Sequence, residues 1–246
     1  MTRAIILAAG RGSRMGELTA EQPKCFARLH GHRLLDWQLQ ALRGAGIERL
    51  ALVRGYRGEC FDEPLTYFEN PHWQQSNMVR TLLAADAWLA AEACIVSYSD
   101  IFYSAATVAA LSRVEADLAI AYDPHWQALW SQRFADPLAD AESFRLDASG
   151  NLATIGERCQ NVAEIEGQYM GLLKFTPAGW AQVRELLLQC GDEAIDRLDM
   201  TSLLRLLLQA GLPIAVSPVQ GPWGEVDAAD DLALYHRLFT PEALHA

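Results

Sequence analysis

The amino-terminal segment constrains the fold of this chain more than any other part. Residues 4–9 form an apolar run, Ala-Ile-Ile-Leu-Ala-Ala, which is typical of a buried strand in a parallel sheet. The run passes into a loop where Gly10, Gly12, Ser13 and Gly16 leave backbone N–H groups unshielded. Such a loop at the carboxyl end of a first strand is where α/β proteins hold phosphate. We therefore expect an α/β fold with an anion site at this loop.

Two common phosphate-binding motifs are excluded by their spacing. A P-loop needs four residues between its first glycine and Gly-Lys-[Ser/Thr], and no such sequence is present here. The dinucleotide-binding fingerprint would need its third glycine at Met15, one residue before Gly16. Positive charge nevertheless gathers at the loop, because Arg11, Arg14 and Lys24 surround it in a chain with a formal net charge of −11. The cluster predicts a polyanionic ligand.

The loop resembles that of the nucleotidylyltransferases. Residues 7–15, Leu-Ala-Ala-Gly-Arg-Gly-Ser-Arg-Met, are followed by Pro23-Lys24 at the spacing of that family. The family joins a nucleoside triphosphate to a sugar phosphate or a small phosphorylated alcohol. The resemblance implies Mg²⁺ as a cofactor and nucleotide contacts from Leu7, Ala8, Ala9, Gly10, Gly12 and Ser13. A loop that only joined a strand to a helix would leave the clustered cations unexplained.

Composition limits the remaining function classes. Apolar residues make up 51% of the 246 residues and charged residues 21%, which suits a sizeable core and not a disordered chain. The 20 basic and 31 acidic residues argue against nucleic-acid and anionic-membrane binding. The five cysteines include no Cys-x-x-Cys pair, and no run approaches the ~20 apolar residues of a membrane span. We expect a soluble, cytoplasmic enzyme of undetermined oligomeric state.

Strand and helix patterns alternate along most of the chain, which predicts a Rossmann-like, doubly wound, mostly parallel sheet with helices on both faces. The spacing of apolar residues predicts helices over 34–42, 78–89, 107–114, 178–190, 199–210 and 229–238, and strands over 4–9, 50–53, 65–69, 94–97, 118–122, 169–175 and 214–216.

The alternation changes between about residues 123 and 168. Residues 144–146 and 152–155 flank Asp-Ala-Ser-Gly-Asn and predict an antiparallel hairpin. The residues before the hairpin have little periodicity, which in a compact domain favours a functional excursion. We interpret residues 1–246 as one nucleotidyltransferase domain, with a nucleotide half over about 1–122 plus C-terminal elements and an inserted substrate-side lobe.

The reaction implied by the resemblance needs cations more than it needs a base. A phosphate monoester is already largely dianionic at neutral pH, so the enzyme must bring two polyanions together and stabilise the charge on the α-phosphoryl and leaving groups. The resemblance assigns Lys24 to the α-phosphate and the incoming phosphate, and Arg14 to the departing β- and γ-phosphates. We expect Lys24 to face solvent-filled phosphate space.

Two aspartates are the predicted Mg²⁺ ligands. Asp100 follows a buried apolar run, at the strand end where open α/β sheets place ligands, and the family carries an aspartate there. Asp227 lies in Trp-Gly-Glu-Val-Asp-Ala-Ala-Asp-Asp, which resembles the family's closing motif before the last helix. Two carboxylates with phosphate oxygens and waters suit octahedral Mg²⁺. Asp227 could instead cap that helix, a role open to Asp230 or Asp231, and Glu225 is expected only nearby.

Gln75, Ser76 and Asn77 precede the helix predicted from Met78, in the region where family members contact the nucleobase. Their amide and hydroxyl groups could pair with the edge of cytosine or uracil. Asn77 also suits the cap of the helix, and the two roles are compatible.

Further resemblances indicate a small acceptor. Residues 70–73, 97–101 and 168–172 look most like the choline-phosphate cytidylyltransferase branch, which loads CTP onto phosphorylated or phosphonylated headgroups, including aminoethylphosphonate and phosphorylated amino-acid amides. The acceptor-binding residues predicted on this basis are Asp123, Trp126, Trp130, Arg133, Tyr169 and Gly171.

The acceptor chemistry of these residues has open alternatives. Trp126 and Trp130 could form a cation–π wall or belong to the core. Asp123, with Asp136 and Asp140, could pair with an amino group, and Arg133 could hold an anionic end. The stretch Arg-Phe-Ala-Asp-Pro that starts at Arg133 departs from the phosphocholine enzymes, which argues against choline itself.

Three functions are compatible with these patterns. The first is a Mg²⁺-dependent cytidylyltransferase acting on CTP and a small phosphate or phosphonate. The second is a sugar-1-phosphate nucleotidylyltransferase using UTP or dTTP. The third is a non-catalytic nucleotide-sensing domain, which predicts loss of Lys24, Asp100 or Asp227, and all three are present.

Overall fold

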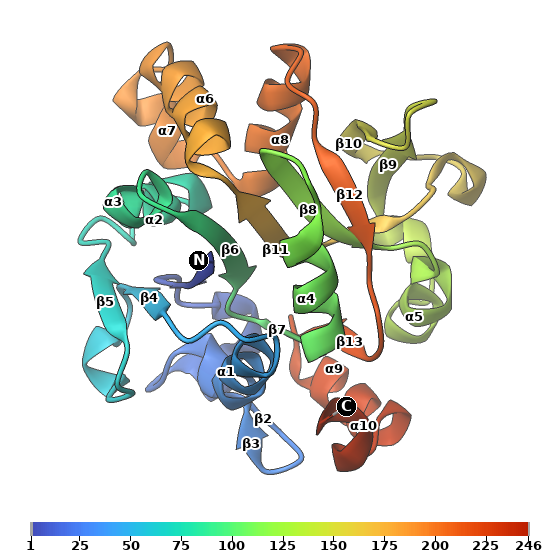
Figure 1. Cartoon of the computed structure of the whole chain (residues 1–246). Coiled ribbons are helices and arrows are strands. Elements are labelled where there is room, and N and C mark those ends of the chain that lie inside the picture. Colours follow the sequence, from blue (N-terminus) through green and yellow to red (C-terminus); the bar gives the residue numbers. More distant parts are fainter. Residues whose placement is uncertain (1, 246) are drawn as a thin grey trace.

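A seven-stranded sheet in the order β12-β8-β11-β6-β1-β4-β5 forms the centre of the molecule (Figure 1). The structure is a computed structural model and describes residues 2–245. Strands β6, β1, β4 and β5 pair in parallel, as do β12 and β8, whereas β11 runs antiparallel to both β6 and β8. The expected mostly parallel α/β sheet is thus confirmed, with one reversed strand inside it.

The central strands are β1 (Thr2–Ala8), β4 (Leu50–Arg54), β5 (Thr66–Glu69), β6 (Ala93–Tyr98), β8 (Leu118–Asp123), β11 (Gln168–Phe175) and β12 (Ala215–Pro218). Three small antiparallel pairs are β2 (Arg28–Leu29) with β3 (His32–Arg33), β7 (Ile101–Tyr103) with β13 (Trp223–Glu225), and β9 (Glu142–Leu146) with β10 (Leu152–Arg158).

The helices are α1 (Leu34–Gly44), α2 (Met78–Leu83), α3 (Asp86–Leu89), α4 (Ala105–Arg113), α5 (Trp126–Arg133), α6 (Pro177–Leu188), α7 (Asp192–Arg197), α8 (Met200–Gln209), α9 (Ala229–Leu238) and α10 (Pro241–His245). Short 3₁₀ segments are η1 (Ser13–Thr19), η2 (Lys24–Phe26), η3 (Gly58–Cys60), η4 (Pro137–Ala139) and η5 (Val162–Glu164).

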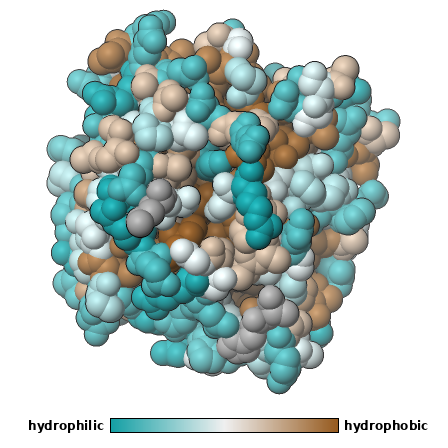
Figure 2. All heavy atoms as spheres, viewed as in Figure 1, coloured by the Kyte–Doolittle hydropathy of each residue, from teal (hydrophilic) through white to brown (hydrophobic). Residues whose placement is uncertain are grey.

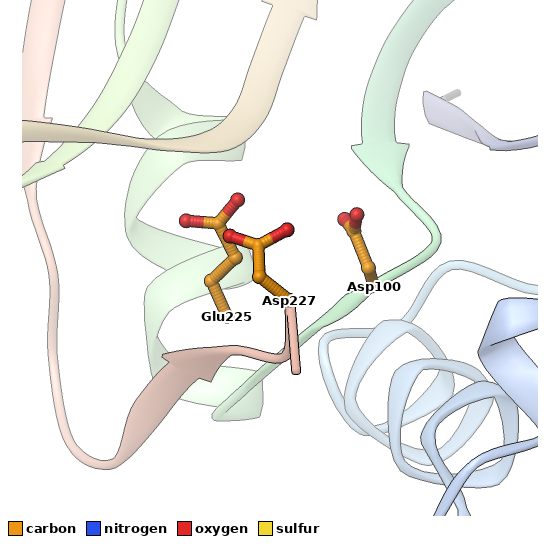
Figure 3. Close-up of side chains that lie close together, drawn as sticks. All are labelled: Asp100, Glu225 and Asp227. Atoms are coloured by element: carbon orange, nitrogen blue, oxygen red, sulfur yellow. The ribbon is translucent and has the colours of Figure 1, made fainter. Parts of the chain in front are cut away.

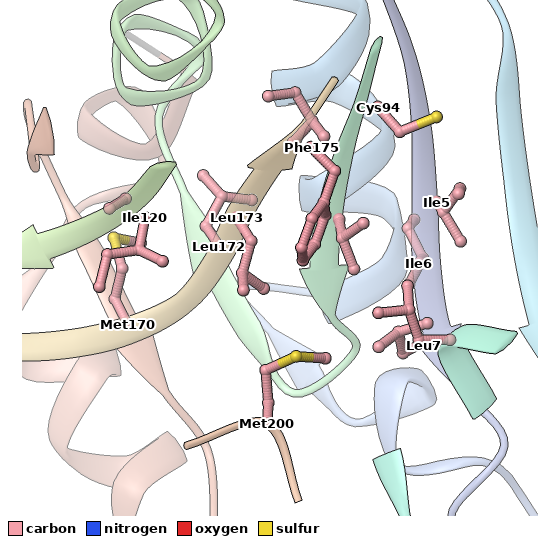
Figure 4. Packing of buried hydrophobic residues seen from close by; sticks show 14 of the residues in the cluster. Ile5, Ile6, Leu7, Cys94, Ile120, Met170, Leu172, Leu173, Phe175 and Met200 are labelled. Carbon is pink, nitrogen blue, oxygen red and sulfur yellow. The ribbon is translucent and has the colours of Figure 1, made fainter. Parts of the chain in front are cut away.

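The strands inside the sheet are mostly apolar and buried because helices cover the sheet. Helix α4 packs on β8, β11 and β12, α2 on β1, α3 on β6 and α6 on β11. Figure 4 shows side chains from β1 and β11 in one continuous core, and Ile5, Ile6 and Phe175 within it are at most 1% exposed. Burial of this apolar surface is the main force that holds the strands in register.

Two helix predictions differ from the structure. The helix predicted over residues 78–89 is divided, with α2 ending at Leu83 and α3 beginning at Asp86. Trp180 Nε1 donates to Asp86 Oδ1 at 2.8 Å, so a tertiary contact fixes the start of the second piece. The aperiodic excursion contains helix α5, whose two buried residues are Trp126 and Trp130. The predicted antiparallel hairpin is present as β9 and β10.

An irregularity in β11 shapes the centre of the molecule. The register of β11 against β8 shifts between Tyr169 and Leu173, and Gly171 there has a φ of +78°. A Cβ on Gly171 would lie 2.7 Å from the ring of Tyr98, so glycine is required by both its φ and the close approach. The shift allows the rings of Tyr98 and Tyr169 to meet edge to face, with centroids 5.8 Å apart.

The surface has few large apolar side chains. Figure 2 shows one face, where hydrophilic side chains surround patches of apolar ones. Among the described residues, the exposed large hydrophobic side chains are Leu18, Leu188 and Leu238. No helix within residues 2–245 has the length and apolar character needed to cross a membrane.

Candidate active site

A nucleotide-side cavity of about 300 Å³ opens where β1 and β6 end. Its lining brings together glycine-loop residues, the cation, one predicted metal ligand and two of the predicted base-contacting residues. The lining residues are Leu7, Ala9, Gly10, Gly12, Lys24, Trp73, Ser76, Asn77, Met78, Thr81, Ser99 and Asp100.

An acceptor-side cavity of about 200 Å³ lies between β11, the β9–β10 hairpin and the loop after β13. Its lining is aromatic and acidic and, among the described residues, contains no lysine, arginine or histidine. The lining residues are Tyr98, Trp130, Asp140, Glu142, Ser143, Phe144, Ile155, Gln168, Tyr169, Met170, Gly171, Thr201, Glu225 and Asp227.

Lys24 connects the two cavities through carboxylates. Its Nζ lies 2.8 Å from Asp100 Oδ2, which belongs to the nucleotide-side lining, and 3.0 Å from Asp227 Oδ1, which belongs to the acceptor-side lining. Burial by itself would lower the pKa of Lys24, but the two carboxylates raise it above its ordinary value. Lys24 lines the nucleotide-side cavity, although its side chain is only 7% exposed.

Strand pairing explains why Asp100 and Asp227 meet although they are far apart in the sequence. Strands β7 and β13 pair antiparallel, with Glu225 opposite Ile101, and the N–H of Val226 donates to the carbonyl of Asp100 at 2.9 Å. The buried Gln38 of α1 fixes the turn on the other side. Its Nε2 donates to the carbonyls of Tyr98 at 2.8 Å and Ile101 at 2.5 Å.

The acidic cluster fits a divalent cation. Asp100, Glu225 and Asp227 each offer one oxygen, and these oxygens all lie within 4.8 Å of one another (Figure 3). Asp100 Oδ1 is buried and accepts no hydrogen bond in the described structure. Removal from water, together with the charges of Asp227 and Asp100, raises the pKa of Glu225 to about 8. An oxygen-only ligand set of this kind is what Mg²⁺ prefers.

Gly12 determines where the side chain of Lys24 can run. The glycine has a φ of +64°, and a Cβ there would lie 2.7 Å from Cδ and 2.9 Å from Cβ of Lys24. No residue with a side chain can therefore occupy this position without moving the lysine.

We expect Gly12→Ala to lower both stability and turnover. The left-handed φ costs alanine about 1–2 kcal/mol, and the added methyl group displaces Lys24. Gly46→Ala is the matched control, since Gly46, beyond the end of α1 and outside the glycine loop, also has a positive φ of 82° and nothing lies within 4 Å of an added Cβ. Thermal unfolding should change similarly in both variants, while kcat falls further in Gly12→Ala. Equal turnover in the two variants would contradict this role of Gly12.

A hydrogen-bond network orders the segment that carries the predicted base contacts. The buried Asn70 donates from Nδ2 to Ser76 Oγ at 3.1 Å and to Thr81 Oγ1 at 3.0 Å. Asn77 caps α2, because its Oδ1 accepts from the N–H of Met78 at 2.8 Å. Trp73, which was not predicted, lines the cavity and packs against Tyr56, with ring centroids 5.2 Å apart.

Some predicted nucleotide contacts lie outside the cavity lining. Ala8 is buried in β1, at 3% exposure, and Ser13 and Gln75 are exposed. Arg11 lies over the ring of Tyr56, 5.7 Å from its centroid. The side chain of Arg14 lies outside the described part of the structure.

The predicted acceptor residues fall into two groups. Trp130, Tyr169 and Gly171 line the acceptor-side cavity. Asp123 and Trp126 do not. Asp123 is buried and accepts hydrogen bonds from Trp223 Nε1 at 2.9 Å and from the N–H of His125 at 2.7 Å.

Trp126 and Arg133 have structural partners instead of cavity positions. Trp126 is 3% exposed and its Nε1 donates to the carbonyl of Ile165 at 3.3 Å. The side chain of Arg133 is completely buried and lies among the carboxylates of Glu225, Asp227 and Asp231, at and after the end of β13. Asp231, one of the two alternative helix caps, accepts from the N–H of Ala228 at 3.0 Å, which leaves the carboxylate of Asp227 for the cluster.

Of the four carboxylates that line the acceptor-side cavity, sequence reasoning named Asp140, Glu225 and Asp227 and missed Glu142. Glu142 and Thr201 line this cavity, from β9 and α8, and neither stands in a motif. The signal for Glu142 was its place two residues before the predicted hairpin.

Comparisons with known proteins find relatives that match this chain over most of its length. Residues 4–160 match the model of the MobA-like NTP transferase domain. The CTP:phosphoglutamine cytidylyltransferase of Campylobacter jejuni is 34% identical over 93% of this chain and 97% of its own. The inositol-1-phosphate CTP transferase of T. maritima has the same fold, with a TM-score of 0.75 at 20% identity over 99% of this chain and 94% of the other. The CTP:phosphocholine cytidylyltransferase of Streptococcus pneumoniae superposes with a TM-score of 0.71 at 16% identity. The match covers 97% of this chain and 99% of the other.

Proposed function

The chain belongs to the MobA-like NTP transferase family and is a nucleotidyltransferase, and from this premise we propose that it transfers CMP from CTP to a small phosphorylated or phosphonylated acceptor in a Mg²⁺-dependent reaction. One observation carries the proposal: a buried lysine and three carboxylates stand between a cavity lined by the glycine loop and a second, acidic cavity. A reaction that joins two phosphates needs this arrangement of two sites around one charged centre.

Each part of the centre has a role in the proposed reaction. An acceptor phosphate oxygen forms a bond to the α-phosphorus, and the bond from that phosphorus to the bridging oxygen of the β-phosphate breaks, releasing pyrophosphate. Lys24 would contact the α-phosphate and the incoming phosphate, and the backbone N–H groups at Gly10 and Gly12 would receive the polyphosphate. Asp100 and Asp227, with Glu225 beside them, would hold Mg²⁺, which neutralises charge on the phosphoryl groups.

The proposed nucleotide is CTP because the Campylobacter jejuni relative, a CTP:phosphoglutamine cytidylyltransferase, matches this chain over almost its whole length. Ser76 and Asn77 line the nucleotide-side cavity and are the candidates for contact with the base. Their side chains carry both donors and acceptors, which a cytosine edge requires.

The acceptor-side cavity favours a headgroup with a positive charge. Asp140, Glu142, Glu225 and Asp227 all line it, and the walls include the rings of Tyr98, Trp130 and Tyr169. These four carboxylates face no lysine, arginine or histidine in the described lining, so negative charge is in excess there. Burial, followed by the charges of Asp199 and Asp140, raises the pKa of Glu142. An ammonium group would relieve that excess and would lie favourably against the rings. We propose an aminoalkyl or amino-acid phosphate or phosphonate.

A substrate matrix tests the proposal. Purified protein is incubated with Mg²⁺, with CTP, UTP, dTTP or ATP, and with aminoalkyl phosphates, aminoalkyl phosphonates, phosphorylated amino-acid amides or hexose 1-phosphates. Pyrophosphate release and product masses are the readouts. We expect release with CTP and an amine-bearing acceptor. Release only with UTP or dTTP and a hexose 1-phosphate would replace this proposal by the sugar-nucleotide one. Absence of both turnover and CTP binding would contradict catalysis.

A further inference from the structure

Arg133, the last residue of α5, has the most completely buried charged side chain near the site. Its guanidinium group is 0% exposed and lines neither cavity. Arg133 contacts three carboxylates: Nε lies 2.9 Å from Asp231 Oδ1 in α9, Nη2 lies 3.4 Å from Asp227 Oδ2 in the loop before that helix, and Nη1 lies 3.6 Å from Oε2 of Glu225, the last residue of β13. Two of these three carboxylates are candidate metal ligands.

Arg133 contacts the side chain of Asp227 directly and is linked to the backbone of Asp227 through Asp231. Asp231 Oδ1 accepts a hydrogen bond from Nε of Arg133. The other oxygen of Asp231, Oδ2, accepts hydrogen bonds from the backbone N–H of Asp227 at 2.8 Å and from that of Ala228 at 3.0 Å. The two carboxylate oxygens of Asp227 are thus divided: Oδ2 faces Arg133, and Oδ1 faces Lys24 at 3.0 Å. This division leaves Oδ1 on the side of Asp100.

The charges around Arg133 indicate that this ion-pair cluster does more than stabilise the fold. A buried ion pair gains little net free energy of folding, because both charges lose their hydration. The carboxylates of Asp100, Glu225, Asp227 and Asp231 outnumber the two cations, Lys24 and Arg133, that contact them, and a divalent cation would balance the excess.

We propose that Arg133 is a positioning residue for the metal centre: it holds Asp227 Oδ2 and Glu225 so that Asp227 Oδ1 points at the cation. The inference rests on the metal site proposed above. The fork of the guanidinium is suited to this task because it can contact several carboxylates in fixed directions, which an ammonium group cannot do.

The same residue links the acceptor-side cavity to the metal centre. The guanidinium carbon of Arg133 lies over the ring of Trp130, 5.1 Å from its centroid, and Trp130 lines that cavity. Trp130 Nε1 donates in turn to Asp140 Oδ2 at 3.0 Å. One helix, α5, therefore carries both a wall of the acceptor-side cavity and the residue that orients Asp227.

Titration with Mn²⁺ by calorimetry, without substrates, tests the inference on the wild type and on Arg133→Met, Arg133→Lys and Asp231→Asn. Loss of a residue that orients a metal ligand costs on the order of 10- to 100-fold in metal affinity. We expect Arg133→Met to raise the Kd by that factor and Arg133→Lys by less, because lysine keeps the charge but not the fork. Asp231→Asn should also weaken binding.

Arg3→Met is the matched control, because Arg3 is likewise buried, pairs with Glu92 and lies over Trp88 at 4.9 Å, away from the site. It should lower the unfolding temperature and leave the Mn²⁺ Kd unchanged. A folded Arg133→Met variant that binds Mn²⁺ as tightly as the wild type, or more tightly, would overturn the inference. If that variant does not fold, unchanged affinity in both Arg133→Lys and Asp231→Asn overturns it equally. A wild type that binds no Mn²⁺ would instead remove the metal site itself.

Discussion

Lys24→Met is expected to lower kcat by roughly 10²- to 10³-fold, the usual effect of removing one group that stabilises transition-state charge. Among the residues that the structure describes, Lys24 alone lines the nucleotide-side cavity and also contacts carboxylates on both sides of the centre. Methionine has a similar length and no charge, so it removes the contact with phosphate while filling the same space. Steady-state kinetics with CTP and the acceptor identified by the substrate matrix provide the measurement.

The same variant should be less stable, because Lys24 is buried and its loss leaves Asp100 and Asp227 without their shared cation. We expect a loss of about 2 kcal/mol, which lowers the unfolding temperature by several degrees in a domain of this size. Lys174→Met separates the two effects. Lys174 is 8% exposed, and its Nζ donates to the carbonyls of Ser112 and Val114, away from both cavities. It should lose stability and keep its turnover. A folded Lys24→Met variant with more than about a tenth of wild-type kcat would contradict the catalytic role.

The apolar pattern predicted most of the elements and not all of their directions. A buried strand is apolar whether its neighbours run parallel or antiparallel, so residues 168–175 gave no sign that β11 is reversed. Helix α5 was missed for a related reason. Only Trp126 and Trp130 are buried in it, and polar residues fill the other positions, so the segment lacks a continuous apolar stripe.

Some residues of the candidate site could be selected from local sequence motifs, and others have roles that depend on contacts far apart in the sequence. Lys24, Asp100 and Asp227 stand in local motifs and could be selected from the sequence, and the structure brings them within hydrogen-bond distance. Gln38 and Arg133 could not be selected for their roles, because Gln38 reaches carbonyls 60 and 63 positions away and Arg133 reaches a carboxylate 98 positions away. Contacts at that separation are set by the packing of the sheet and not by spacing in the chain.

Asp100→Asn should abolish most of the metal-dependent turnover while it preserves the shape of the side chain. A bound divalent cation is worth several kcal/mol of transition-state stabilisation, so losing a carboxylate ligand should lower kcat on the order of 10³-fold. Asparagine keeps one oxygen for Lys24, whose Nζ lies 2.8 Å from Asp100 Oδ2, so we expect only a small loss of stability. The measurement is kcat as a function of Mg²⁺ concentration, together with thermal unfolding.

Asp123→Asn is the control that distinguishes a metal ligand from a structural aspartate. Asp123 is 6% exposed and both of its oxygens accept hydrogen bonds, so its loss should destabilise the fold. The described contacts give it no part in the acidic cluster, so the Mg²⁺ concentration that gives half-maximal turnover should stay at the wild-type value. Asp100→Asn should show the opposite pattern: an unfolding temperature near that of the wild type and a metal response that is weak or lost. If Asp100→Asn mainly unfolds the protein and the surviving fraction responds to Mg²⁺ normally, Asp100 is a structural residue that pairs with Lys24, and the metal centre must be assigned to Glu225 and Asp227 without it.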